Sequence, residues 1–281
     1  MGRLGIIAAR GTLPLELAQA AQSRGERPYI ICLEGQSDAD YSAFEHGIFA
    51  PGQLKAVTRA LGQSGCDRLL LAGKFTRPSL RQLKLDSTGA ALLGRLALKG
   101  DDTALRLISD YFASHQITVL PNTDFLPERL LAKGYHFGRP LNEGEEAALR
   151  LGVVLLSAIG HLDVGQAVIA QQDRILAIEA AEGTAAMIAR TADLIDNSAD
   201  GVVFVKMAKS RQDKALDMPV IGIETIESLA KAGVQVIAVE ASHTMLADSL
   251  EAVEAVLDDH QMILTTHLEV PAFPENNPEE K

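Results

Sequence analysis

The sequence predicts an α/β protein of two domains, and three observations support this. Short apolar runs bounded by turn residues alternate with helical patterns along the chain, as in strands connected by helices. The length of 281 residues fits two domains at the usual size of roughly 150 residues each. Hydrophobic residues make up 47% of the chain, which is enough for packed cores and excludes general disorder.

The first half is expected to form a Rossmann-like parallel sheet. Pro14 suits the first turn of a helix and Gly25 suits its end. The predicted strands are Leu4–Ala8, Tyr29–Leu33, Gly47–Phe49, Arg68–Ala72 and Ile117–Leu120. The predicted helices are Pro14–Arg24, Gln53–Gln63, Gly89–Leu98 and Thr103–His115. This N-terminal domain should span residues 1–136, because the stretch Lys133–Pro140 lacks apolar periodicity.

The second half, residues 137–270, is expected to form an α/β domain that carries the catalytic residues, with the active site in the cleft between the domains. A long helix, Glu143–Ile159, opens it, with Asn142 as its cap. The predicted strands are Gln166–Ala170, Ile175–Ala180, Val202–Lys206, Val220–Ile223, Val234–Val239 and Met262–Thr266. The predicted helices are Thr184–Leu194, Thr225–Ala232 and Ala247–Leu257. Residues 271–281 contain three prolines and should form a frayed tail.

Composition narrows the possible partners and the compartment. The chain has 26 Lys and Arg residues and 37 Asp and Glu residues. The resulting net charge of −11 argues against nucleic-acid binding. Cys32 and Cys66 lie in apolar runs and are expected to be reduced core residues. The longest apolar stretch, Leu151 to Gly160, has about half the length of a membrane span, and no signal-peptide pattern occurs. We therefore expect a cytoplasmic protein.

Two turns of the first half could bind a phosphate or a nucleotide. After the first strand, Gly11, Thr12 and Leu13 open a helix, where backbone N–H groups and the helix dipole favour an anion. An ordinary strand-to-helix turn is an equally good interpretation. Glu34 follows the second strand, where a dinucleotide enzyme holds a ribose. The G-x-G-x-x-G spacing is missing, which argues against NAD.

Basic and acidic residues follow later elements of the same half. Lys74 and Phe75 come directly after a very hydrophobic strand, where they could hold a phosphate and stack on a base. A solvated basic loop is the alternative. Asp101 stands just ahead of the helix predicted from Thr103, where an acidic residue most often caps the helix. Its carboxylate could instead bind a ribose hydroxyl or a metal-bound water.

Three segments of the second half carry further candidates. Val164, Gly165 and Gln166 precede a strand, and Gly183 and Thr184 follow one and open a helix. Each is a weak signal alone. The loop after Val202–Lys206 crowds cations together and contains two aspartates, a mixture suited to Mg²⁺ and a diphosphate, although a charged surface loop would look the same. Its candidates are Lys206, Lys209, Arg211, Asp213, Lys214 and Asp217.

Ordered motifs resemble one known family. The segments G-I-I-A-x-x-G-x-L-P, A-G-K-F-T-R-P, K-G-D-D, I-G-x-L-D-V-G-Q, E-A-x-E-G-T and Q-D-x-x-x-D-x-P-x-I-G follow one another between Gly5 and about Gly233. The set resembles the UDP-2,3-diacylglucosamine pyrophosphatases of the LpxI type. Two departures stand out: the turn Ala9–Gly11 has few glycines, and Ala215 occupies a position that is often basic.

The resemblance implies an activity, a cofactor and partners. Enzymes of this family hydrolyse UDP-2,3-diacylglucosamine to UMP and 2,3-diacylglucosamine 1-phosphate (lipid X) in lipid A biosynthesis. They need Mg²⁺ or another divalent cation, form homodimers, and must contact the inner membrane transiently because the substrate is a lipid. Asp217 corresponds to the essential aspartate, and we expect Asp213 to be a second metal ligand. The substrate contacts implied or expected are Gly11, Thr12, Leu13, Lys74, Phe75, Asp101, Val164, Gly165, Gln166, Gly183, Thr184, Lys206 and Lys214.

Two other functions remain open on the sequence alone. A non-catalytic protein that binds nucleotide sugars would share the anion sites without needing Asp217. A nicotinamide-dependent oxidoreductase would rest only on the first turn and Glu34. No zinc site is expected, because the seven histidines show no H-E-x-x-H or similar spacing.

Overall fold

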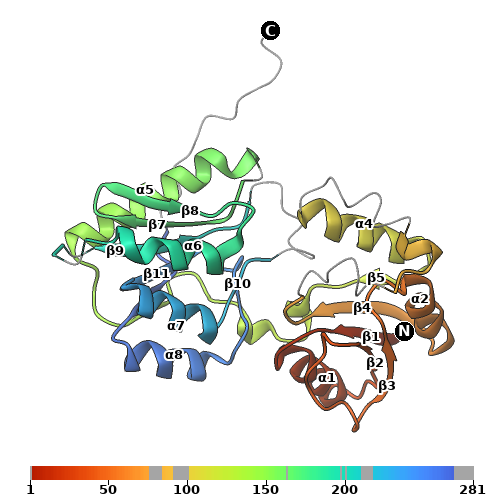
Figure 1. Ribbon diagram of the computed structural model, residues 1–281. Coiled ribbons are helices and arrows are strands. Elements are labelled where there is room, and N and C mark those ends of the chain that lie inside the picture. Colours follow the sequence, from red (N-terminus) through yellow and green to blue (C-terminus); the bar gives the residue numbers. More distant parts are fainter. Residues whose placement is uncertain are drawn as a thin grey trace, which may run out of the picture. The chain divides into compact units, whose positions relative to one another are not determined.

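A computed structural model describes residues 2–75, 84–90, 101–162, 164–196, 198–199, 201–209 and 218–268. They form two compact units, residues 2–128 and the described residues from 129 onward, each with its own sheet (Figure 1). The boundary predicted at residue 136 lies in a strand of the second unit. Most of the helix predicted at Gly89–Leu98 and the tail 271–281 lie outside the described residues.

The first unit contains a five-stranded sheet in which every neighbouring pair is parallel. The strand order is β3-β2-β1-β4-β5, so the order reverses direction at β1, as in Rossmann folds. This confirms the parallel sheet predicted for the first half. The strands are β1 (Arg3–Ala8), β2 (Tyr29–Leu33), β3 (Glu45–Phe49), β4 (Cys66–Ala72) and β5 (Thr118–Val119).

Helices cover both faces of this sheet. Helices α2 (Leu54–Gln63) and α4 (Asp101–Ala113) pack on one face, where Leu61 and Phe112 are fully buried with Ile31. Helix α1 (Leu13–Ser23) lies against β1 on the other face (Figure 1). Two short 3₁₀ helices follow the sheet, η1 (Asn122–Asp124) and η2 (Pro127–Arg129).

The second unit contains a mixed six-stranded sheet of order β6-β13-β11-β9-β7-β8. Strands β13, β11 and β9 are parallel, β7 is antiparallel to β9, and β8 is antiparallel to β7, so β8 runs in the direction of β9. The strands are β6 (His136–Phe137), β7 (Ala167–Gln171), β8 (Arg174–Ile178), β9 (Val202–Lys206), β11 (Val236–Val239) and β13 (Ile263–Thr265). A separate pair is formed by β10 (Val220–Ile221) and β12 (Met245–Leu246).

Alternate residues of the second sheet enter two different cores. Val203 and Val205 of β9 pack with α5, whereas Val202 and Phe204 pack with α6, α7 and α8. Helix α5 lies on one side of this sheet and the other three helices lie on the opposite side (Figure 1). This two-sided burial explains why β9 is apolar almost throughout. The helices are α5 (Glu143–Ile159), α6 (Gly183–Thr191), α7 (Ile223–Ala232) and α8 (Leu250–Asp259), with the 3₁₀ turns η3 (Gly160–Leu162) and η4 (Ala192–Leu194).

Most predicted elements are present, and the differences are local. The helix predicted from Thr103 begins at Asp101 as described, so Asp101 and Asp102 lie within α4 and not ahead of it. The last residue of the predicted strand Val220–Ile223 is instead the first residue of α7. Strands β6 and β12 were not predicted, and among the described residues no helix is long and apolar enough to cross a membrane.

A buried carboxylate organises the start of α5. The side chain of Asn142 accepts a hydrogen bond from the Glu145 N–H, and the Glu145 carboxylate accepts one from the Asn142 N–H, so both form a capping box. Arg139 donates two hydrogen bonds of 2.8 and 2.6 Å to the same carboxylate. Burial would raise the pKa of Glu145, but these hydrogen bonds and the Arg139 charge together lower it.

We predict that Glu145→Ala destabilises the protein by about 2 kcal/mol at pH 7, because it removes the half of the capping box that the Glu145 side chain supplies and leaves Arg139 without this carboxylate. Since the pKa of Glu145 is lower when folded, its stabilisation is present above the unfolded value of 4.5 and is lost as the pH falls below it. Urea unfolding at several pH values measures both effects. Glu146→Ala, which removes only an exposed ion pair with Arg150, is the control and should change stability by less than about 0.5 kcal/mol.

Both cysteines are buried and free, as predicted. Burial raises the pKa of the Cys32 thiol and raises that of Cys66 to about 11. The thiolate is the reactive form, so only about one Cys66 thiol in a thousand is ionised at pH 8. We predict that the native protein reacts with Ellman's reagent at least about 100-fold more slowly than the urea-unfolded chain. Rapid native reaction of either thiol would contradict this burial.

Candidate functional site

The candidate residues of the second unit gather at one edge of its sheet. Strands β8, β9 and β11 end at this edge and β7 begins there, because Ala167 lies opposite Lys206 in the antiparallel register. The Met207 N–H continues this pairing by donating to the Gln166 carbonyl at 3.0 Å. Ligands of open α/β sheets characteristically bind beyond the carboxyl ends of strands.

Lys206 is the last residue of β9 and is only 5% exposed. Its ammonium donates a hydrogen bond of 3.1 Å to the Val220 carbonyl and one of 3.4 Å to the Thr184 hydroxyl. Val220 begins β10, so Lys206 connects the end of β9 to the start of a second strand pair. A buried ammonium with such contacts places a positive charge at the strand edge.

A buried glutamate lies on the other side of Thr184. Glu179 follows β8 and is 7% exposed. One of its carboxylate oxygens accepts a hydrogen bond of 2.6 Å from the Thr184 hydroxyl, and the other accepts one of 3.2 Å from the Gln166 N–H. The N-cap of α6 is Glu182, so Thr184 does not cap this helix. Its hydroxyl proton points to Glu179 and not into open space.

Two glycines shape the chain around this group. A Cβ atom on Gly165 would lie 2.0 Å from the Glu179 carbonyl oxygen, so only glycine fits there. Gly183 has a φ of 79°, which favours glycine, and opens α6. Val164 is 42% exposed beside Gly165. The structure thus brings Gly165, Gln166, Thr184 and Lys206 together, as candidates from three separate segments of the sequence.

Glu240 joins this edge and was not among the predicted residues. It follows β11 and accepts a hydrogen bond of 2.9 Å from the Ala208 N–H. Its other oxygen lies 3.1 Å from Nδ1 of His243. Lys209 is partly buried in the same segment as Ala208. The sequence signal that could have identified Glu240 is its position directly after a buried strand, because the carboxyl ends of parallel strands meet at one edge of a sheet.

In the first unit, two candidate turns lie side by side after β1 and β4. The Lys74 N–H donates to the Arg10 carbonyl at 2.9 Å, and the Ala9 N–H donates to the Ala72 carbonyl at 2.8 Å. Gly73, with a φ of 91°, permits this approach. Lys74 is exposed, and Phe75 is 48% exposed. These turns lie where the strand order reverses, which is the usual ligand position in such sheets.

An acidic side chain occupies the first of these turns. The Gly11 N–H donates a hydrogen bond of 3.0 Å to the carboxylate of Asp38. Thr12 is the N-cap of α1 but makes no side-chain capping bond, and Leu13 is buried. The Asp38 carboxylate therefore takes the place at Gly11 that the anion-site hypothesis assigned to a phosphate.

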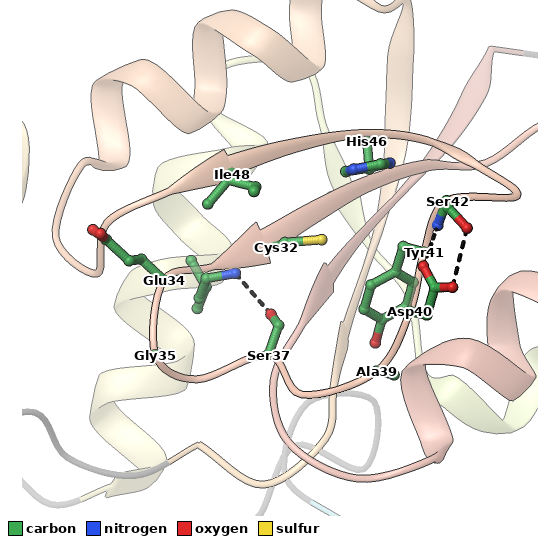
Figure 2. A pocket seen from close by; sticks show the side chains of 11 residues that line it. Cys32, Glu34, Gly35, Ser37, Ala39, Asp40, Tyr41, Ser42, His46 and Ile48 are labelled. Atoms are coloured by element: carbon green, nitrogen blue, oxygen red, sulfur yellow. Dashed lines mark hydrogen bonds between the residues drawn. The ribbon is translucent and has the colours of Figure 1, made fainter.

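A separate pocket of about 390 Å³ lies between β2, β3 and the loop that connects them (Figure 2). Tyr41 lines it beside Cys32, and within the described part of the chain its buried hydroxyl has no hydrogen-bond partner. Burial raises the pKa of Tyr41 to about 12, so the phenol stays protonated at neutral pH. Glu34 also lines the pocket, and its carboxylate lies 2.9 Å from the Lys84 ammonium.

Several candidates lie beyond what the structure describes. Arg211, Asp213, Lys214 and Asp217 are outside the described residues, as is the side chain of Asp101. Within the described ranges, no group of three His, Cys, Asp or Glu side chains is arranged to hold a metal ion. Asp213 and Asp217, the metal ligands expected from the sequence, both lie in the segment 210–217 and so outside those ranges.

We predict that Gly73→Ala costs at least about 3 kcal/mol, because its φ of 91° disfavours a side chain and the new Cβ would lie 2.6 Å from the Arg10 carbonyl oxygen. Gly11→Ala is the matched control. It shares a positive φ of 98° but meets nothing within 4 Å, so it should cost only about 1–2 kcal/mol. Chemical unfolding of both variants measures the difference, and equal losses would contradict the close approach of the two turns.

Comparisons with known proteins agree with the two-unit division. Residues 3–129 match the model of the LpxI N-terminal domain, and residues 132–265 match that of the LpxI C-terminal domain. UDP-2,3-diacylglucosamine pyrophosphatase LpxI of Caulobacter vibrioides (strain ATCC 19089 / CIP 103742 / CB 15) is 33% identical over 268 residues, covering 92% of this chain and 95% of that protein.

Similarity to solved structures is much weaker. The biotin carboxylase subunit of pyruvate carboxylase gives a TM-score of 0.27 at 11% identity, over 60% of this chain and 35% of that one. N5-carboxyaminoimidazole ribonucleotide synthetase from Thermotoga maritima gives a TM-score of 0.25 at 13% identity, over 65% of this chain and 42% of that one. The family models instead account for nearly the whole chain, and the chain belongs to the LpxI family.

Proposed function

We propose that this protein hydrolyses the phosphoanhydride bond of UDP-2,3-diacylglucosamine to UMP and 2,3-diacylglucosamine 1-phosphate, a step of lipid A biosynthesis. The observation that carries the proposal is family membership across both units, with a relative named for this substrate. The strand edge around Lys206 supports it, because a buried ammonium there offers the positive charge that a reacting diphosphate needs.

Described residues of each unit have chemistry suited to part of this substrate. In the second unit, Lys206 would offset the charge that develops on the phosphate oxygens, and Gly183, which has open space where a Cβ would stand, would let the backbone approach them. Gly165 would contribute by keeping the 165–166 turn against Glu179. In the first unit, exposed Phe75 would stack on the base, and Lys74 would contact a phosphate. The Gly11–Leu13 turn would contribute backbone contacts to the nucleotide.

Asp217, with Asp213 as a second ligand, is proposed to hold Mg²⁺ or another divalent cation, since carboxylate oxygens are the ligands that Mg²⁺ prefers. When bound, such a cation supplies positive charge at phosphate oxygens and a place to orient water. In the sequence, Asp217 precedes Val220 by three residues, and the Val220 carbonyl accepts a hydrogen bond from Lys206. Lys214, in the same segment, would add a further phosphate contact.

Exposed apolar side chains support contact with the acyl chains. Leu162 is 58% exposed and Val164 is 42% exposed, and both precede Gly165 in the chain. Val154 on α5 is 44% exposed. We propose that these residues form an apolar rim that contacts the lipid substrate and, transiently, the cytoplasmic face of the inner membrane. The family resemblance also leads us to propose a homodimer.

We predict that the purified protein releases UMP from UDP-2,3-diacylglucosamine with Mg²⁺ and loses this activity in excess EDTA. Asp217→Asn should lower kcat at least about 100-fold, because an amide binds a divalent cation far less well than a carboxylate. Chromatographic measurement of UMP provides the assay, and circular dichroism checks that the fold is retained.

Asp258→Asn, the same change on the exposed end of α8, is the control and should leave kcat unchanged. If the wild-type protein releases no UMP with any divalent cation, the proposed activity is wrong. If the Asp217→Asn variant keeps kcat within about threefold of wild type, the proposed metal role of this residue is wrong instead.

A further inference from the structure

The Thr184 hydroxyl has a single proton, and its surroundings determine where that proton points. Glu179 is a carboxylate, which only accepts hydrogen bonds, and Lys206 is an ammonium, which only donates them. The Thr184 oxygen therefore donates to Glu179 at 2.6 Å and accepts from Lys206 at 3.4 Å. This order leaves the hydroxyl no proton with which to bind a phosphate oxygen.

Burial makes this arrangement directional. Glu179 is 7% exposed and Lys206 is 5% exposed, so water screens neither charge well. Opposite charges linked through one hydroxyl hold it in a fixed orientation, because both hydrogen bonds are assisted by charge. Reversal of the hydroxyl would place its proton against an ammonium and leave a carboxylate oxygen without its donor.

Glu179 also fixes the chain around it. Its second oxygen accepts a hydrogen bond of 3.2 Å from the Gln166 N–H, and its own N–H donates to the Ala167 carbonyl at 2.9 Å. Gly165 lies against the Glu179 backbone, where no Cβ fits. One buried carboxylate thus holds both the 165–166 turn and the Thr184 side chain.

We propose that Glu179 is a positioning residue, which acts through Thr184 to hold the Lys206 ammonium in place for the diphosphate. This inference rests on the proposed hydrolysis of UDP-2,3-diacylglucosamine. In that reaction, Thr184 contributes through Lys206 and not through a hydrogen bond to substrate. Loss of the arrangement should slow the reaction at the stage where charge develops on phosphate, and so lower kcat more than it raises KM.

The central experiment compares kcat and KM of four variants with UDP-2,3-diacylglucosamine. Glu179→Gln keeps the shape but removes the charge, and Thr184→Val removes the hydroxyl. Each should lower kcat at least about tenfold and change KM by less than about threefold. Thr184→Ser restores a hydroxyl and should stay within about threefold of wild type.

The fourth variant, Glu179→Gln combined with Thr184→Val, tests whether the two residues act as one unit. Groups in one network give non-additive losses, so the double variant should be no more than about threefold slower than the slower single variant. Losses that multiply would show that Glu179 acts independently of Thr184 and would overturn the proposal. A wild-type kcat in Thr184→Val would overturn it as well.

Glu182→Gln is the matched control, because it makes the same chemical change three residues along the chain, at a side chain paired with Arg190. Its kcat should equal that of wild type. Thermal unfolding of every variant shows whether Glu179 has a purely structural role. In that case Glu179→Gln would lower the stability but leave kcat per folded molecule unchanged, and the proposal would be wrong.

A spectroscopic measurement separates failure of this inference from failure of the proposed activity. In ¹⁵N-labelled protein, a buried and hydrogen-bonded lysine ammonium exchanges its protons slowly enough to give a resolved NMR signal, assigned here by its absence in Lys206→Arg. We expect this signal in wild type and Thr184→Ser, and its loss or a large shift in Thr184→Val and Glu179→Gln. An unchanged Lys206 signal in both latter variants would overturn the inference, whether or not the wild type hydrolyses this substrate.

Discussion

The interaction on which the second unit's strand edge depends is the pair of opposite buried charges linked through the Thr184 hydroxyl. Removing an ammonium or a carboxylate from water costs several kcal/mol per ion, unless hydrogen bonds and an opposite charge replace the lost hydration. Lys206 meets this requirement at the Val220 carbonyl and the hydroxyl, and Glu179 meets it at the hydroxyl and the Gln166 N–H. The ends of β8 and β9 are thereby joined to the starts of β7, β10 and α6.

This requirement explains residue identities that would otherwise look unrelated. Gly165 must lack a side chain because the backbone of Glu179 lies directly against it. Thr184 needs a hydroxyl because a purely apolar side chain would remove one hydrogen bond from each of the two buried charges. Small and polar residues next to strand ends can therefore be required by a buried charge pair as well as by a bound ligand.

Elements with a strong local pattern could be predicted from the sequence. The bounds of β2, β9 and α5 agree with the prediction, because their apolar spacing and the Asn142 cap are encoded within the segment. Strands β6 and β12 have two residues each, too few to show a period, and exist because partners distant in sequence pair with them. The start of α7 likewise depends on Asp248, which accepts a hydrogen bond from the Ile223 N–H at 2.8 Å.

Part of the candidate site could likewise be predicted from the sequence, and part could not. That Gln166, Thr184 and Lys206 share an edge could be expected, since each stands beside a strand end. The direction of the Thr184 proton could not be predicted from the sequence, because it depends on the Glu179 carboxylate, whose burial only the folded chain determines. The same holds for Glu240, whose contact with Ala208 joins residues 32 positions apart.

The two candidate anion sites differ in what already fills them. At the start of α1, the Gly11 N–H is bound by the negative charge of Asp38, so an incoming phosphate would have to displace a carboxylate or bind beside it against like-charge repulsion. At the end of β9, the buried ammonium of Lys206 attracts a phosphate oxygen in the low local dielectric, and the Glu179 carboxylate at the same edge is already hydrogen-bonded to Thr184 and Gln166. In the proposed reaction, we therefore assign the diphosphate to the second unit. The first unit, with exposed Phe75 and Lys74, has side chains better suited to the nucleoside and its nearest phosphate.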